Sequence, residues 1–183
     1  FVTAQHVLDM AHQKPLNQQK IDVAVRKLSP ENHARDEQVI HDDPTLTDAD
    51  IHGKPVFILG IDKDKSALKQ GPVGCKILGG NAVQLTREWV DVAFANARPF
   101  VKERLYRSFM VEIPAQETEG DTIESRLISG ISGSEAWVVV NGRKTFAGIF
   151  HMAHGIPGGK GLAFFYPASV VREQYEHYMR NVA

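Results

Sequence analysis

The clearest pattern of apolar and polar positions lies in the C-terminal third of the chain. Residues 137–150 contain two β-rich runs that flank Asn141-Gly142. Asn-Gly favours a two-residue type I′ turn, because both central residues of that turn need a positive φ. The pattern therefore predicts a β-hairpin in which Trp137 lies opposite Phe146.

Other segments show strand or helix periodicity. The continuous apolar run at 56–61 is β-branched and short, which favours a buried strand. Leu85, Trp89 and Val92 recur at helical spacing, so we predict that the longest helix covers 82–98 and buries Trp89. The remaining predictions are short helices in the N-terminal 1–50, an irregular glycine-rich stretch at 71–80, strands at 110–113, 123–127 and 162–166, and a closing helix from Pro167 onward.

This order of elements predicts a single α+β domain over 1–183, with a helical N-terminal part at 1–50 and a second part at 55–183. Sequential antiparallel strands with segregated helices form a layered architecture. We expect an antiparallel sheet of four to six strands packed against the long helix at 82–98, with N-terminal helices and a C-terminal helix around it.

Composition narrows the class of protein only slightly. The chain of 183 residues has a net charge of −1, so the sequence argues against nucleic-acid binding. Cys75 is the only cysteine, which excludes an intramolecular disulfide. Lys76 beside it is a reason to consider a reactive thiolate, but a free cysteine is more often a small buried apolar residue.

The segment 151–161 is the richest in chemistry. His151 and His154 are candidate metal ligands or acid–base groups, and the glycines with Lys160 are candidates for binding an anion. Tyr166 and Trp137 are candidates for lining a small-molecule pocket. The interpretation that we prefer for the segment is a wide hairpin connection between two strands, since Lys160 is followed by a strand instead of a helix, and binding of an anion or a metal is the alternative.

Two other groups of residues carry weaker signals. Histidine and carboxylate side chains gather at 33–43, where a solvated surface is the usual explanation. Ser132 lies in Gly-Ile-Ser-Gly-Ser, which lacks the Gly-x-Ser-x-Gly form of a nucleophile elbow and predicts a turn between strands. The sequence therefore predicts no catalytic residue, no metal and no cofactor.

The function that the sequence favours is a non-enzymatic module for binding, sensing or assembly. The chain begins at Phe1, which suggests the extracytoplasmic domain of a membrane-tethered bacterial protein, reaching the membrane only through a segment outside this chain. The alternative is an enzyme or small-ligand-binding protein that uses His151, His154 and Lys160. A protein partner or a homodimer is expected in the first case.

Self-association is predicted from the hairpin, because both of its faces are apolar and a half-exposed sheet should alternate. The N-terminal helices, a second copy of the chain or a different subunit must cover the second face, and a homodimer is the commonest symmetric solution. One face carries Trp137, Val139, Phe146, Phe150 and Met152, and the other carries Val138, Val140, Ala147 and Ile149.

Overall fold

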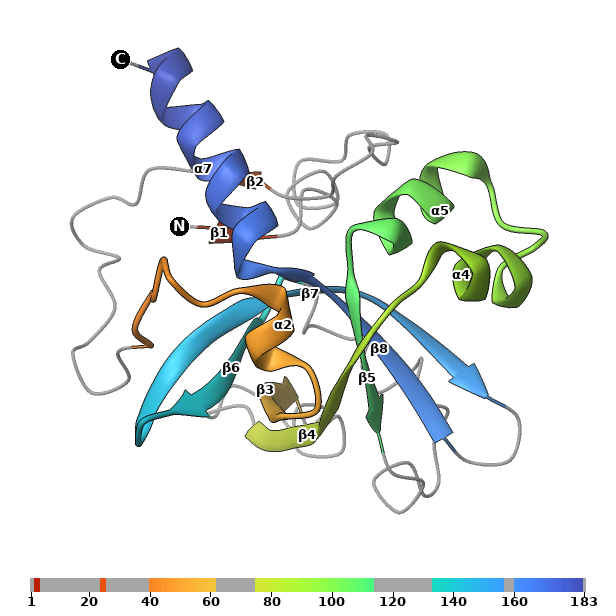
Figure 1. Ribbon diagram of the computed structural model, residues 1–183, viewed down its shortest axis with the longest axis horizontal. Helices are drawn as coiled ribbons and strands as arrows, with labels where there is room; N and C mark the ends of the chain where they lie inside the picture. The colour runs from red at the N-terminus through yellow and green to blue at the C-terminus, as the bar shows by residue number, and fades with distance from the viewer. Residues whose placement is uncertain are drawn as a thin grey trace, which may run out of the picture.

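A computed structural model describes residues 2–3, 24–25, 40–61, 75–113, 133–156 and 160–182 (Figure 1). Its strands are β1 (Val2–Thr3), β2 (Ala24–Val25), β3 (Pro55–Ile61), β4 (Cys75–Gln84), β5 (Phe109–Ile113), β6 (Glu135–Val140), β7 (Arg143–Ile156) and β8 (Lys160–Pro167). Its helices are α2 (Asp48–Ile51), α4 (Arg87–Ala93), α5 (Pro99–Tyr106) and α7 (Ala168–Val182). None of these helices is both long and apolar enough to cross a membrane.

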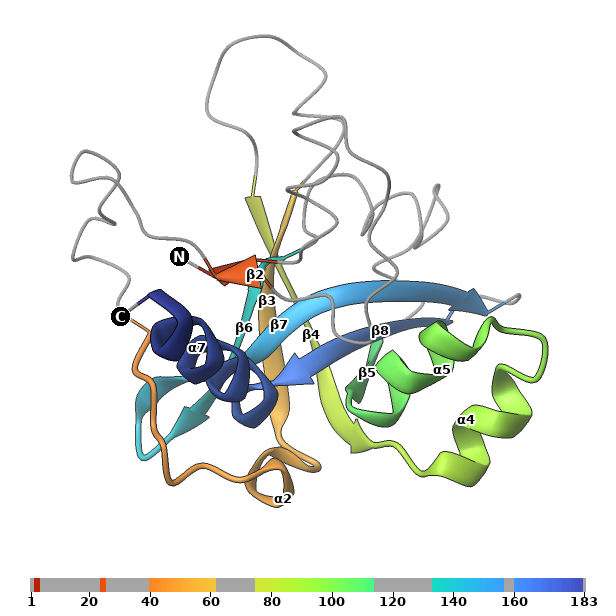
Figure 2. The same ribbon diagram turned by 90° about the horizontal axis from the view of Figure 1, so that it is seen from above.

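Six of the strands form a closed antiparallel barrel in the order β3-β4-β5-β8-β7-β6 (Figures 1 and 2). The predicted α+β layer is therefore wrong, since no long central helix lies against an open sheet in the described part of the chain. The sheet instead closes on itself when β6 pairs with β3, joining Val138 to Val56 in the register. Closure leaves the six-stranded sheet without a free outer strand, which is one way in which all-β folds avoid exposed edges.

The predicted helix at 82–98 is the main error. Its first residues belong to β4, and the helix α4 begins only after Thr86, whose hydroxyl accepts a hydrogen bond from the Trp89 amide at 3.2 Å. Ala82 lies inside the barrel with 1% of its surface exposed, whereas Trp89 is 37% exposed. The predicted helix thus combined residues 82–84 of a strand with a short surface helix. Trp89 was wrongly predicted to be buried.

The prediction of an irregular segment at 71–80 is also wrong for 75–80, which belong to β4, while 71–74 lie outside the described residues. Gly80 lies within β4 and is paired with Val56 of β3. A Cβ atom at Gly80 would lie 2.0 Å from the carbonyl oxygen of Glu112 in β5. The glycine is therefore required by the close approach of two strands, instead of by a turn.

The predicted hairpin is confirmed. Trp137 pairs with Phe146, and Val138 pairs with Thr145. Asn141 has a φ of 50° and the following glycine a φ of 74°, as a type I′ turn requires. The strands predicted at 56–61, 110–113 and 162–166 and the C-terminal helix are confirmed as well.

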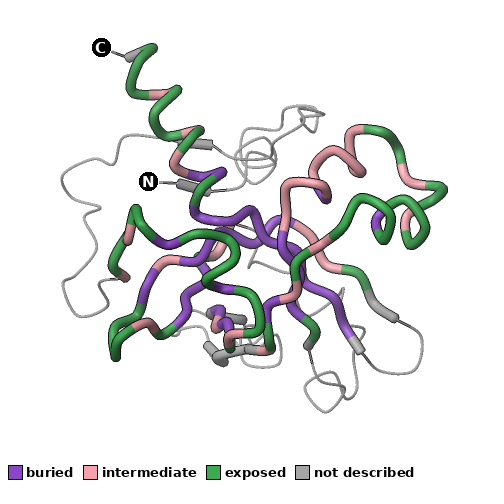
Figure 3. Tube along the Cα trace, viewed as in Figure 1, coloured by how far each residue is buried: buried purple, intermediate pink, exposed green. Residues whose placement is uncertain are grey.

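The second apolar face of the hairpin is covered by the fold itself. Val138 and Ala147 belong to the core cluster inside the barrel, where they pack with Phe150. Ile149 packs instead with Tyr166 beneath α7. The reason for expecting a second copy of the chain on this face is therefore removed, because barrel closure and α7 bury it (Figure 3).

The N-terminal part contains short strands where helices were predicted. Val2–Thr3 pairs antiparallel with Ala24–Val25, and α7 contacts β2. The predicted strand at 123–127 and most of the predicted N-terminal helices lie outside the described residues. The segment before β3 contains α2, whose first turn carries a capping box between Thr47 and Asp50.

Helices α4 and α5 are joined by a hydrogen bond between their side chains. The Tyr106 hydroxyl donates to the Asp91 carboxylate at 2.5 Å, and Lys102 lies 3.5 Å from the same oxygen. The hydrogen bond from Tyr106 is the main reason why the pKa of Asp91 is lowered, with Lys102 acting in the same direction. The same bond raises the pKa of Tyr106, because it favours the protonated hydroxyl.

Replacing Tyr106 with phenylalanine is expected to raise the pKa of Asp91 towards its ordinary value. A lowered carboxyl pKa in the folded protein contributes stability above the unfolded pKa, and this stability is lost as the pH falls through the folded pKa. The variant should therefore lose less stability than the wild type on acidification through this range. A carboxyl NMR titration of Asp91 measures the shift, with Tyr178→Phe on α7 as the control. An unchanged Asp91 pKa in Tyr106→Phe would contradict the assignment.

Candidate functional site

A buried histidine on β7 forms the most specific polar contact of the barrel wall. His151 is 6% exposed, and its Nε2 lies 2.8 Å from the Ser108 hydroxyl. Ser108 follows α5 and donates its only hydroxyl proton to the carbonyl of Arg104 at 2.7 Å. The serine oxygen must then accept from His151, which places the imidazole proton on Nε2.

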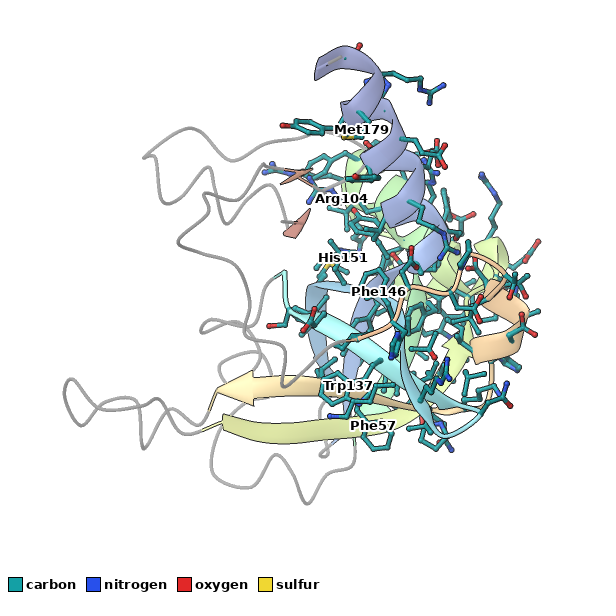
Figure 4. The ribbon with its side chains drawn as sticks, turned by 90° about the vertical axis from the view of Figure 1, so that its left-hand side faces the viewer. Phe57, Arg104, Trp137, Phe146, His151 and Met179 are labelled. Carbon is teal, nitrogen blue, oxygen red and sulfur yellow. The ribbon has the colours of Figure 1, made fainter. Side chains whose placement is uncertain are left out.

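The histidine ring is held on its face as well as at its edge. The rings of His151 and Tyr166 stack with centroids 4.1 Å apart and an interplanar angle of 16°. The strand register shifts between Phe150 and Met152, so His151 is the extra residue of a β-bulge. Bulges turn one side chain out of the regular alternation, and here the bulge directs the imidazole onto Tyr166 and Ser108. Figure 4 shows His151 on the side of the barrel where β1 and β2 lie.

A groove of about 230 Å³ lies on the other side of Ser108. Its walls come from α2, the end of β4, the α5–β5 junction and the start of α7. His52 borders it and accepts a hydrogen bond from the Gln84 amide at 3.1 Å. The guanidinium of Arg107 also borders it and is paired with Glu173. The groove is lined by both polar and apolar residues, and Ser108 is one of them.

The residues just before β6 are fixed to β7 next to this histidine. The Gly133 amide donates to the Phe150 carbonyl at 2.9 Å, and the Phe150 amide donates to the Ser134 carbonyl at 2.9 Å. Gly133 has a φ of 85°, a left-handed conformation that favours glycine. A tight turn is thus held at Phe150, one residue before His151. Ser132, which immediately precedes this turn in the sequence, lies outside the described residues.

The short ladder of β1 and β2 lies beside α7, outside the barrel (Figure 2). Because the strands are antiparallel, the end of β1 and the start of β2 lie at the same end of the ladder. In the sequence, His6 comes three positions after Thr3, and Asp22 comes two positions before Ala24. Their own positions are outside the described residues.

The structure separates the other residues that the sequence singled out. His154 is exposed, and its ring meets the edge of Phe94 with centroids 5.4 Å apart. Trp137 stacks on Phe57 of β3, and the ammonium of Lys144 lies 5.4 Å from its ring centroid. The predicted set thus places His151 against Tyr166 but gives His154 and Trp137 other neighbours. Binding of a ligand by these residues remains a prediction.

The structure does not place the remaining candidate residues, Lys160, Cys75 and the cluster at 33–43, in a site. Lys160 begins β8 opposite Ile156, but its side chain and that of Cys75 are not described, and most of the cluster at 33–43 lies outside the described residues. Within the described segments, no group of three histidine, cysteine or carboxylate side chains is arranged to hold a metal ion.

Comparisons with known proteins assign no family to this chain. No model of a protein family matches the sequence, and a search of curated proteins finds no match.

A sequence pattern other than the Gly-x-Ser-x-Gly motif indicates the turn at Gly133. That signal is the combination of Gly-x-Ser-Gly with a β-rich run on each side. The prediction of a turn between strands was made there, but the serine was not recognised as a candidate nucleophile.

Proposed function

We propose that the chain is a serine hydrolase domain that cleaves peptide bonds, with Ser132 as the nucleophile, His6 as the general base and Asp22 as the residue that orients His6. The observation that carries this proposal is the turn at Gly133, fixed to β7 by reciprocal backbone hydrogen bonds at Phe150. A nucleophilic serine is commonly presented on a tight turn beside glycine, where its backbone is held while its hydroxyl stays accessible.

The order of the three residues along the chain supports the same class. His, Asp and Ser in this sequence order are one of the known arrangements of the triad, and it is the arrangement found on antiparallel β-barrels. In the sequence, His6 follows β1 and Asp22 precedes β2, and β2 contacts α7. The same helix packs on β7, which fixes the serine turn.

The reaction would follow the usual course of acyl transfer. The Ser132 hydroxyl attacks the carbonyl carbon of the substrate while His6 removes its proton, and Asp22 holds the imidazole in the required tautomer. The proton is then delivered to the departing amine. Water releases the acyl group from Ser132 in a second step, in which His6 again acts first as base and then as acid.

The proposal is tested with a fluorophosphonate probe, whose phosphorus is attacked by an activated serine with loss of fluoride. We expect stoichiometric labelling of the protein and a modified peptide that contains Ser132. Ser132→Ala should abolish labelling and hydrolysis of a fluorescent casein substrate, whereas the neighbouring Ser134→Ala should retain both. A folded wild-type protein without labelling, or equal labelling of Ser132→Ala, would overturn the proposal.

A second candidate is the non-enzymatic binding module favoured by the sequence. Its specific support is a set of exposed apolar side chains on α4 and α7, which includes Val92 at 81% and Met179 at 47% exposure. Figure 3 shows that much of the backbone of both helices is exposed. Apolar surface of this kind is typical of protein contacts when it is contiguous. A folded protein that neither reacts with the probe nor hydrolyses casein would favour this function.

A further inference from the structure

The turn between β6 and β7 exposes an asparagine side chain together with the amide group that follows it. Asn141 and Gly142 are both exposed, and a Cβ atom at Gly142 would meet no atom within 4 Å. Within the described segments, neither the Asn141 carboxamide nor the Gly142 N–H takes part in a hydrogen bond. The pairing of the two strands begins beside this peptide unit, at Val140 and Arg143. The carboxamide and the amide are therefore available to react with each other.

The turn also provides a way for these two groups to meet. In the type I′ turn, the Gly142 nitrogen is directed away from the Asn141 side chain. Rotation of the peptide unit between the two residues gives a type II′ turn, which keeps a positive φ only at the first of them and brings the nitrogen next to that side chain. Glycine adopts either sign of φ, so Gly142 permits the rotation. Because a type II′ turn favours glycine at the first position, the rotated form with asparagine there is a minor state and the reaction is slow.

Other asparagines in the described part of the chain are followed or held by hydrogen bonds. The amide after Asn81 donates to the Lys54 carbonyl at 3.0 Å, and the amide after Asn96 donates to the Phe94 carbonyl at 2.9 Å. The side-chain amide of Asn181 donates at 2.8 Å to a carbonyl one turn earlier in α7. Attack by the following nitrogen would break a hydrogen bond at each of these positions. The same attack at Asn141 breaks none in the described structure.

We propose that Asn141 is a site of spontaneous deamidation, with the Gly142 nitrogen as the nucleophile. This nitrogen loses its proton and forms a bond to Cγ of Asn141, while the side-chain nitrogen takes up a proton and leaves as ammonia. The product is a cyclic imide. Water then adds to one of the two imide carbonyls, and cleavage of the C–N bond at that carbonyl gives either aspartate or isoaspartate.

Both products change the end of the hairpin. Each adds a negative charge in place of a neutral carboxamide, in a cleft of about 510 Å³ that Asp42, Asp43 and Arg143 also line. Isoaspartate in addition inserts a CH₂ group into the main chain of the two-residue loop. Because loop length fixes the register of a hairpin, this product strains the pairing of Val140 with Arg143. The isoaspartate form is therefore less stable than the unmodified protein.

The test incubates the folded protein at mildly alkaline pH, which favours loss of the proton from the Gly142 amide, and maps its peptides by mass spectrometry. We expect aspartate and isoaspartate to accumulate at residue 141 while Asn81 and Asn96 stay unmodified. The rate in the folded protein should lie within about tenfold of the rate in urea, because the tip of a turn opens locally at little cost. An amide that persists at residue 141 in the folded protein but is lost in urea would overturn the proposal. Equal modification of Asn81 and Asn96 in the folded protein would overturn the argument from hydrogen bonds.

The matched control is Asn141→Gly, which keeps a residue that tolerates positive φ and removes the carboxamide. After incubation, wild-type protein should unfold at a lower urea concentration than fresh protein, whereas the incubated variant should keep the midpoint of its fresh sample. An equal loss of stability in both proteins would overturn the assignment of this loss to the turn.

Discussion

Replacing His6 with alanine is expected to lower kcat for peptide hydrolysis by about 10⁴-fold to 10⁶-fold. A general base that is removed from a Ser-His-Asp triad leaves the serine hydroxyl protonated during attack, and the triad residues act as a unit. Asp22→Asn should cost about 10⁴-fold, because the asparagine side chain holds the histidine in the wrong tautomer. Binding should change little, so KM is expected to stay within about threefold. Steady-state kinetics on a fluorogenic peptide measure both constants.

The matched control for these variants is His177→Ala. His177 is exposed on α7, where its imidazole lies 3.1 Å from the Asn181 side-chain amide. Its removal should leave kcat unchanged. If Ser132→Ala abolishes hydrolysis while His6→Ala retains at least a tenth of the activity, the base is a different group. That result would remove His6 from the proposed mechanism while keeping Ser132 as the nucleophile.

Local signals predicted the parts of the barrel whose turns are encoded by neighbouring residues. The hairpin at Asn141-Gly142 is correct because the turn type depends on two adjacent residues that tolerate positive φ. The identity of β4 depends instead on distant partners. Gly80 is selected by the carbonyl of Glu112, which is far away in the sequence. Closure of the barrel by β3 and β6 has the same origin, because it pairs residues about 80 positions apart, as Val56 and Val138 show.

The candidate site was predicted less well than the fold. His151 and His154 were named together as candidates for one site, and the structure places Ser108 and Tyr166 around His151 and Phe94 against His154. A β-bulge decides this, and spacing along the sequence cannot show which residue a bulge turns outward. Ser132 was set aside because its motif ends in Gly-Ser. The hydrogen bonds that fix the following turn to Phe150 come from the tertiary fold.

The largest expected effect on stability belongs to Gly80→Ala, which we expect to destabilise the protein by about 3–5 kcal/mol. The new Cβ would lie 2.0 Å from the Glu112 carbonyl oxygen and 2.9 Å from Cγ1 of Val111. A side-chain rotation cannot relieve the first contact, because the oxygen belongs to the backbone. β4 and β5 must then move apart, and in a closed barrel this displacement is passed to the neighbouring strand pairs. Urea unfolding followed by circular dichroism measures the change in the free energy of unfolding.

Gly142→Ala is the control for this experiment, because its added Cβ meets no atom within 4 Å. It should cost only about 1 kcal/mol, which is the strain of placing alanine at positive φ. The sign of the stability change caused by Gly80→Ala distinguishes a strand paired closely with β5 from a helix or an open irregular segment. If residue 80 lay in a helix or an open irregular segment, glycine-to-alanine substitution would stabilise the chain by about 0.5–1 kcal/mol. A gain in stability for Gly80→Ala would therefore exclude the close pairing of β4 with β5, while a large loss would follow from the closed barrel.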